Sequence, residues 1–339
     1  MFKKSILIAS LTFCALGIYS FAFADDATPP ATGTAQGLTI SPPINDLSLK
    51  PGGTDSEIIR VTNPTQNLVE VYPVAMNFNS KGEGGEPNFT AANDENSKFT
   101  LAKWISFTQP KLALMPNQVV EFKYDINVPA EAEPGGHYGV VFLSTNPPEK
   151  TPGASQVSIA SMVGSLLLVK IPGDTQEVGT LNEFSSSAFY LKPPVNLTTR
   201  ISNSGNIHFK PEGTIEIKDW KGGEVNKITF NEERGNVLPD SVRKFENKWL
   251  SSDLPFYKIP VGRFTADLNL KYGANDKTFA STVVFWIIPR YIIITFIALL
   301  LLIALVLIII LRKKRKNRNR YQNYPPHNPH QNENYRPRM

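Results

Sequence analysis

Hydrophobic and polar positions alternate along several stretches of the chain. In "VVEFKYDINV", residues 119 to 128, every second residue from Val120 onward is apolar. The stretch "FTADLNLKYG" repeats this alternation from Phe264 to Tyr272. A period of two over this length predicts half-buried strands of antiparallel sheets. Between Leu38 and Pro289 no stretch has the pattern of a long helix.

Turn-forming residues separate the predicted strands. Examples are Pro51-Gly52-Gly53, Asn63-Pro64-Thr65 and Asn203-Ser204-Gly205-Asn206. These residues favour tight turns because they supply unusual backbone angles or bond to nearby backbone groups. Short strands separated in this way are typical of β-sandwiches.

The two halves of this region resemble each other. Arg60-Val61-Thr62-Asn63 in the first half matches Arg200-Ile201-Ser202-Asn203 in the second. The sequence therefore predicts an all-β protein with two tandem immunoglobulin-like sandwich domains, over residues 37–173 and 178–289. The boundary between them is expected near "IPGDTQEVG", residues 171–179.

The ends of the chain carry membrane signals. Basic, apolar and small residues follow one another in residues 1–24, as in a secretory signal peptide, and residues 25–36 form a predicted linker. The single cysteine, Cys14, follows Phe13 rather than a small residue, which disfavours a lipoprotein anchor. Residues 290–311 are apolar for long enough to cross a bilayer. Residues 312–339 are predicted to be a basic, disordered cytoplasmic tail.

The net charge of +5 could suggest a nucleic-acid ligand. The tail contributes +8 and Lys3 and Lys4 contribute +2, which leaves −5 for residues 25–311. The basic character therefore belongs to the membrane topology signals, and the outer region is mildly acidic. No nucleic-acid partner is expected.

The segment "EAEPGGHYGVVFLS", residues 131–144, places His137 and Tyr138 between glycines and a run of β-formers. We interpret it as the entry to a central strand, in which Tyr138 and Phe142 face one side and Val141 and Leu143 the other. A catalytic or metal-binding histidine needs partners, and the outer region offers only His208, in the other predicted domain. No catalytic residue, cofactor or metal ligand is assigned.

Two further groups of residues are candidate sites. The loop at residues 79–99 contains Glu83, Glu86, Asp94 and Glu95, but their spacing lacks the alternation of a calcium loop, so a solvated, mobile loop is expected. Trp104, Trp220 and Trp249 could stack on sugars, although burial in the core or at a sheet edge is the default interpretation. Trp286 is expected to be an anchor at the membrane interface.

The assembled motifs resemble the WxL-interacting proteins, a family of bacterial surface proteins. They include "SPPINDLSLKPGG", "PGGHYGVVFLS", "NSGNIHFKPEGTIEIKDWKG" and "VGRFTADLNLKYG", followed by "VFWIIPR" at the membrane helix. The resemblance implies two extracytoplasmic immunoglobulin-like domains without enzymatic activity. It associates the first domain with peptidoglycan and the second with surface proteins or host ligands. The loop at residues 79–99 departs from the family pattern.

The first expectation is therefore a non-enzymatic scaffold, anchored in the plasma membrane with its N-terminal domains outside. It would bind peptidoglycan or surface proteins, by strand addition at an open sheet edge among other routes. An assembly chaperone or secretion accessory for surface proteins is the alternative. An enzyme such as a wall hydrolase is a third hypothesis, but the sequence shows no nucleophile motif, phosphate loop or histidine cluster.

Overall fold

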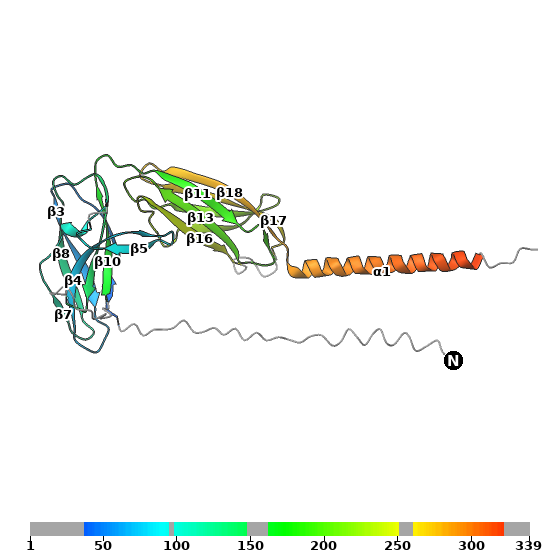
Figure 1. The fold of residues 1–339 in the computed structure, drawn as a ribbon, viewed down its shortest axis with the longest axis horizontal. Helices are drawn as coiled ribbons and strands as arrows, with labels where there is room; N and C mark the ends of the chain where they lie inside the picture. The colour runs from blue at the N-terminus through cyan, green and yellow to red at the C-terminus, as the bar shows by residue number, and fades with distance from the viewer. Residues whose placement is uncertain (1–36, 95–97, 148–161, 251–259, 322–339) are drawn as a thin grey trace, which may run out of the picture.

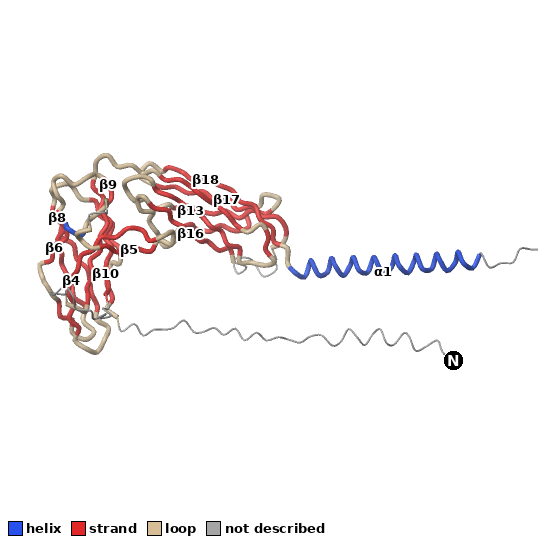
Figure 2. Tube along the Cα trace, viewed as in Figure 1, coloured by secondary structure: helices blue, strands red, loops and turns tan. Residues whose placement is uncertain are grey.

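A computed structural model describes residues 37–94, 98–147, 162–250 and 260–321. Two β-sandwich domains lie end to side in an L, and one long helix extends from the far end of the second domain (Figure 1). Strands dominate both domains and a single helix follows them (Figure 2). The prediction of an all-β protein with two tandem immunoglobulin-like sandwiches and a C-terminal helix is confirmed.

The first domain contains two packed sheets. One has the strand order β1-β3-β8-β6, and the other has the order β2-β10-β9-β4-β5, with β7 paired to β4. The strands are β1 (Thr39–Ser41), β2 (Ile44–Ser48), β3 (Thr54–Thr62), β4 (Val69–Lys81), β5 (Glu86–Thr90), β6 (Ile105–Phe107), β7 (Leu112–Leu114), β8 (Val119–Asn127), β9 (Gly135–Ser144) and β10 (Met162–Ile171). A short 3₁₀ turn, Ala102–Trp104, precedes β6.

Alternating apolar residues build the core of the first domain. Phe122, Tyr124 and Ile126 of β8 point into it, as the period of two predicts. They pack against Val141 and Leu143 of β9 on the facing sheet. Strand β9 therefore contributes only one of its faces to this core.

The second domain repeats this construction. One sheet has the strand order β11-β13-β16 and the other β12-β18-β17-β14-β15. The strands are β11 (Gly179–Ser186), β12 (Phe189–Tyr190), β13 (Val195–Asn203), β14 (Glu212–Asp219), β15 (Glu224–Phe230), β16 (Ser241–Trp249), β17 (Gly262–Tyr272) and β18 (Lys277–Ile287). Trp249 is fully buried and packs against Phe264 and Phe285 in the core between these sheets.

The predicted mobile loop at residues 79–99 is instead largely ordered, and that prediction is wrong. Its first part is a β-hairpin of β4 and β5 that extends from the first domain toward the second (Figure 1). Buried Asn77 ties down the following segment, because its Nδ2 donates to the Ala91 carbonyl and its Oδ1 accepts from the backbone of Leu101 and Ala102. Such hydrogen bonds hold in place a segment whose polar composition alone predicts a solvated loop.

The helix α1 spans Arg290–Tyr321, and Arg290–Arg315 is long and apolar enough to cross a membrane. It continues beyond residue 311, so residues 312–321, predicted to be disordered, are helical. The predicted signal peptide, the linker at 25–36 and the rest of the tail lie outside the described residues.

Candidate functional site: the cleft between the domains

The outer face of the sheet β2-β10-β9-β4-β5 is turned toward the second domain. On β9, Val141 and Leu143 enter the sandwich core, whereas Tyr138 belongs to a separate apolar cluster on the opposite face. This is the alternation expected for "GGHYGVVFLS", and β9 is the central strand of its sheet. The sequence did not indicate that the second face would be covered by another domain.

Tyr138 makes the central polar contact between the domains. Its hydroxyl accepts a hydrogen bond of 3.0 Å from the backbone N–H of His208 and lies 3.1 Å from His208 Nδ1. The other ring nitrogen faces the carboxylate of Asp46, which only accepts, so Nδ1 accepts from the Tyr138 hydroxyl and the neutral imidazole carries its proton on Nε2. That atom faces Asp46 Oδ1 at 3.4 Å, and Asp46 lies 3.4 Å from Lys170.

Burial controls the protonation of this group. Burial lowers the pKa of His208, although the neighbouring Asp46 opposes the shift. Burial also raises the pKa of Tyr138 far above its ordinary value. Partial burial acts against ionisation of Asp46, but hydrogen bonding and attraction to His208 and Lys170 lower its pKa overall. At neutral pH, His208 is therefore a neutral link between two strands of the first domain.

Asn206 makes a second set of contacts at the elbow between the domains. Its carbonyl accepts from the backbone N–H of Gly136, and its Nδ2 donates to the carbonyls of Pro134 and Asp174. A Cβ on Gly136 would lie 2.0 Å from the Tyr138 hydroxyl oxygen. Gly135 has φ +136°, and a Cβ there would lie 2.7 Å from the Asn206 carbonyl. The paired glycines thus allow close approach of the second domain.

Apolar side chains complete the contact. Phe78, Tyr138 and Leu168 form a small buried cluster against which Leu238 of the second domain packs. A pocket of about 230 Å³ opens beside them between the domains. Its apolar wall comes from β2, β4 and β10 of the first domain, including Ile44 and Leu166, and its polar wall from residues 233–243 of the second.

The edge of strand β10 continues past this pocket, where the described residues cover it incompletely. Strand β2 pairs with it only from Leu166 to Lys170. The N–H of Leu166 bonds to the Pro43 carbonyl, away from β9, so residues of the same parity direct their backbone groups to that edge. Met162 and Gly164 have this parity, and no backbone partner on that side is found for them within the described residues. Met162 is exposed.

The other candidate residues from the sequence, a histidine and the tryptophans, lie in different parts of the molecule. His137 is buried, with each ring nitrogen 3.0 Å from a backbone carbonyl, of Thr100 or Glu133. Its ring lies 4.4 Å from the Trp104 ring between centroids, with the planes tilted by 42°. Trp249 lies in the core, as expected, whereas Trp220 is 65% exposed on the turn after β14 and does not fit the default of burial. Trp286 is partly exposed on β18, close to the helix.

Some of the acidic residues in the segment at residues 79–99 make contacts with other parts of the protein. Glu83 forms an ion pair with Arg200 of the second domain, at 2.7 Å. Within the described ranges, no group of three or more His, Cys, Asp or Glu residues is placed to hold a metal ion. Glu95 lies outside these ranges.

No protein-family model and no curated protein matches the sequence. Solved structures match its fold. A class 5 fimbriae chaperone, CfaA, is 14% identical, with a TM-score of 0.35, over 75% of this chain and all of its own. The E. coli chaperone DraB is 15% identical, with a TM-score of 0.32, over 74% of this chain and 96% of its own. The Salmonella enterica SafB chaperone, in complex with the SafA pilin, is 12% identical, with a TM-score of 0.31, over 73% and 96%.

These matches correct the first functional expectation. The matched proteins are chaperones, one of them bound to a pilin, and not wall-binding scaffolds, so the expectation of a peptidoglycan-binding scaffold is wrong. At such low identity the likeness concerns the arrangement of strands.

Proposed function

We propose that this chain is a membrane-anchored assembly chaperone or secretion accessory that holds extended segments of surface proteins on the outer side of the membrane. The observation that carries the proposal is the edge of β10 at Met162 and Gly164, which no described strand covers and which belongs to the strand that supplies Leu166 to the apolar wall of the cleft. An unpaired edge takes up another chain through backbone hydrogen bonds, and neighbouring pockets select its side chains.

The cleft provides a place for those side chains. Ile44 is about half exposed, and Phe89 is 37% exposed beside Phe142 on the same face of the sheet. Exposed apolar side chains that adjoin an open edge are suited to transient contact with the apolar strand of an unfinished client. A chaperone needs such contacts to be reversible, and a short edge limits their strength.

The helix α1 fits a membrane anchor. The basic residues that follow it, from Arg312 onward, favour a cytoplasmic tail, which would place both sandwich domains outside. In this arrangement the cleft would meet clients as they emerge from export. The chain would have no enzymatic role, and its resemblance to WxL-interacting proteins remains a prediction.

The test uses cells that naturally produce the protein. Deleting it should lower the amount of its client proteins at the cell surface, whereas loss of a static scaffold should leave them made but released into the medium. Met162→Pro removes an edge N–H that no strand of the described chain uses, so the variant should fold and yet fail to restore the clients.

Met115→Lys and Met162→Lys form a matched pair, because both methionines are more than half exposed. A charge at the edge blocks strand addition. Met162→Lys should therefore fail and Met115→Lys should restore the clients. Full restoration by Met162→Pro and Met162→Lys would contradict the proposal.

A further inference from the structure

The second domain has an open side of its own. Strands β15 and β16 are the edge strands of its two sheets, and a groove of about 930 Å³ lies between them. The walls include Ile228 of β15 and Phe245 of β16, and Gly84 of the first domain closes one end. Glu233 and Arg243 line both this groove and the cleft, so the two adjoin, but the edge strand of the groove is β16 and not β10.

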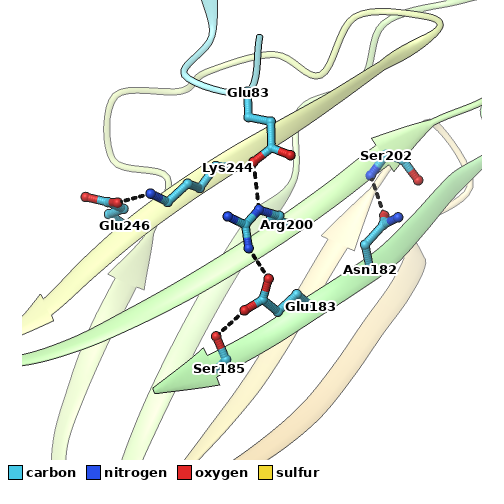
Figure 3. Close-up of polar contacts among 8 residues, drawn as sticks. All are labelled: Glu83, Asn182, Glu183, Ser185, Arg200, Ser202, Lys244 and Glu246. Carbon is cyan, nitrogen blue, oxygen red and sulfur yellow. Dashed lines mark hydrogen bonds and ion pairs between the residues drawn. The ribbon is translucent and has the colours of Figure 1, made fainter. Parts of the chain in front are cut away.

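The hairpin of the first domain shows what the β16 edge can bind. The Lys244 N–H donates to the Glu83 carbonyl at 2.7 Å, so a backbone group from another domain already pairs with this edge. The side chain of Arg200 also holds the hairpin there, because it bridges Glu83 and Glu183, whereas Lys244 pairs with Glu246 of its own strand (Figure 3). The contact stops at the hairpin tip.

Beyond this point, no strand of the described residues pairs with the remaining edge. In an antiparallel pair, alternate residues direct their N–H and C=O away from the partner strand. Since the Lys244 N–H points away from β13, Glu246 and Lys248 also face the open side. No backbone partner on that side is found for these two within the described residues, and both side chains are exposed.

The groove also contains polar atoms that lack partners. Asn247 Oδ1 and Arg243 Nε are buried without a hydrogen-bond partner in the described part of the chain. Both residues lie on the inward-facing side of β16, with Phe245 between them. Buried polar atoms without partners are costly, and a ligand that supplies them gains affinity.

We propose that the β16 edge is a second acceptor site, which pairs with an extended polypeptide segment of a partner protein in continuation of the hairpin tip. Backbone groups of the segment bond to Glu246 and Lys248. Its alternate side chains, apolar or hydroxyl-bearing, enter the groove beside Phe245 and Asn247. This site does not depend on the β10 edge.

The probe for the test is a fluorescent peptide in which valine alternates with threonine, with glutamate at both ends. A peptide of the same composition with its valines grouped together is the control ligand. Binding to the full-length protein in detergent micelles is followed by fluorescence anisotropy and by hydrogen exchange. The alternating peptide should bind more tightly than the control and should slow amide exchange at Glu246 and Lys248.

Variants of one residue separate backbone from side-chain effects. Lys248→Pro removes the outward N–H and should weaken binding about tenfold, whereas Lys248→Ala keeps it and should bind like the wild type.

Glu83→Lys repels Arg200 and loosens the hairpin tip. It should tighten peptide binding, because the Lys244 N–H is then free to bond to the peptide. Met162→Pro should change nothing here, which separates this site from the β10 edge.

Three results would overturn the inference. The first is unchanged exchange at Glu246 and Lys248 on addition of peptide. The second is loss of binding in Met162→Pro alone. The third is a dimer of the free protein that disappears in Lys248→Pro, since the edge would then belong to a second copy of the chain.

Discussion

The two sandwiches contain the same buried asparagine at the same place. Asn63 follows β3 and Asn203 ends β13, and both are buried. Each Nδ2 donates to the carbonyl four residues later and to a carbonyl far away in the sequence, of Leu114 or Val237, and each Oδ1 accepts from the N–H two residues later. The repeated "Arg-x-x-Asn" thus marks the same hydrogen-bond arrangement in both domains.

The arginines of that repeat have diverged. Arg60 is mostly exposed and pairs with Glu121 on the neighbouring strand of its own domain. Arg200 is half as exposed and bridges Glu183 of its own domain to Glu83 of the other (Figure 3). The framework is shared, but only the second copy connects the two domains.

The largest effect is expected from removing a buried asparagine. Asn203→Ala removes the side-chain partner of the Ile207 carbonyl and of the Gly205 N–H, and one of the two donors to the Val237 carbonyl, which should cost about 3 kcal/mol of stability. Asn63→Ala should cost a similar amount if the hydrogen-bond arrangement is the same. Calorimetry measures both, with the exposed Asn127→Ala as control. An effect confined to one domain's asparagine would break the equivalence.

A smaller effect is expected at the contact between the domains. Tyr138→Phe keeps the ring but removes the hydroxyl, and leaves the buried His208 N–H without its partner. The cost should be about 1–2 kcal/mol. The two domains should then unfold in better separated calorimetric transitions. Tyr124→Phe is the control, since Tyr124 is buried in one domain and its hydroxyl has no hydrogen-bond partner within the described residues.

Acidification should weaken the same contact. Because burial lowers the pKa of His208 in the folded protein, the unfolded chain binds the extra proton first. The stability from neutral His208 is present above about pH 6.5 and is lost as the pH falls toward the folded-state pKa. Asp46, Lys170 and Lys210 surround the imidazole, and the attraction of Asp46 moderates the loss.

The measurement is thermal unfolding of the wild type and of His208→Gln between about pH 7.5 and about pH 5.5. The wild type should lose more stability over this range. Equal slopes for the two proteins would contradict the assignment to His208.

Local patterns predicted the sandwiches because alternation and turn chemistry are set by neighbouring residues. Phe122 and Phe264 lie in the two cores as the alternation of β8 and β17 requires. The hairpin of β4 and β5 escaped prediction because its order depends on distant contacts. Asn77 bonds to Leu101, and Glu83 to Arg200, neither of which the composition of residues 79–99 can indicate.

The sequence predicted the candidate site only in part. "GGHYG" indicated close backbone approach, but not that Asn206 and His208 of the other domain would be the groups that approach. The signal that could have found them is the asymmetry of the repeat. "NPTQNLVE" and "NSGNIHFK" begin at Asn63 and Asn203, and among their differences Asn206 and His208 stand where the first has Gln66 and Leu68.

The smallest effects separate the two arginines. Arg200→Ala should lower the melting temperature less than Tyr138→Phe does, because the pair is partly exposed and screened by water. Its specific consequence should be faster hydrogen exchange in the hairpin of β4 and β5, since Glu83 loses its partner. Arg60→Ala should leave that hairpin unchanged, because its partner Glu121 lies on β8. Equal exchange in both variants would show that the hairpin is fixed by the backbone bond to Lys244 alone, and that the divergence of the arginines has no part in joining the domains.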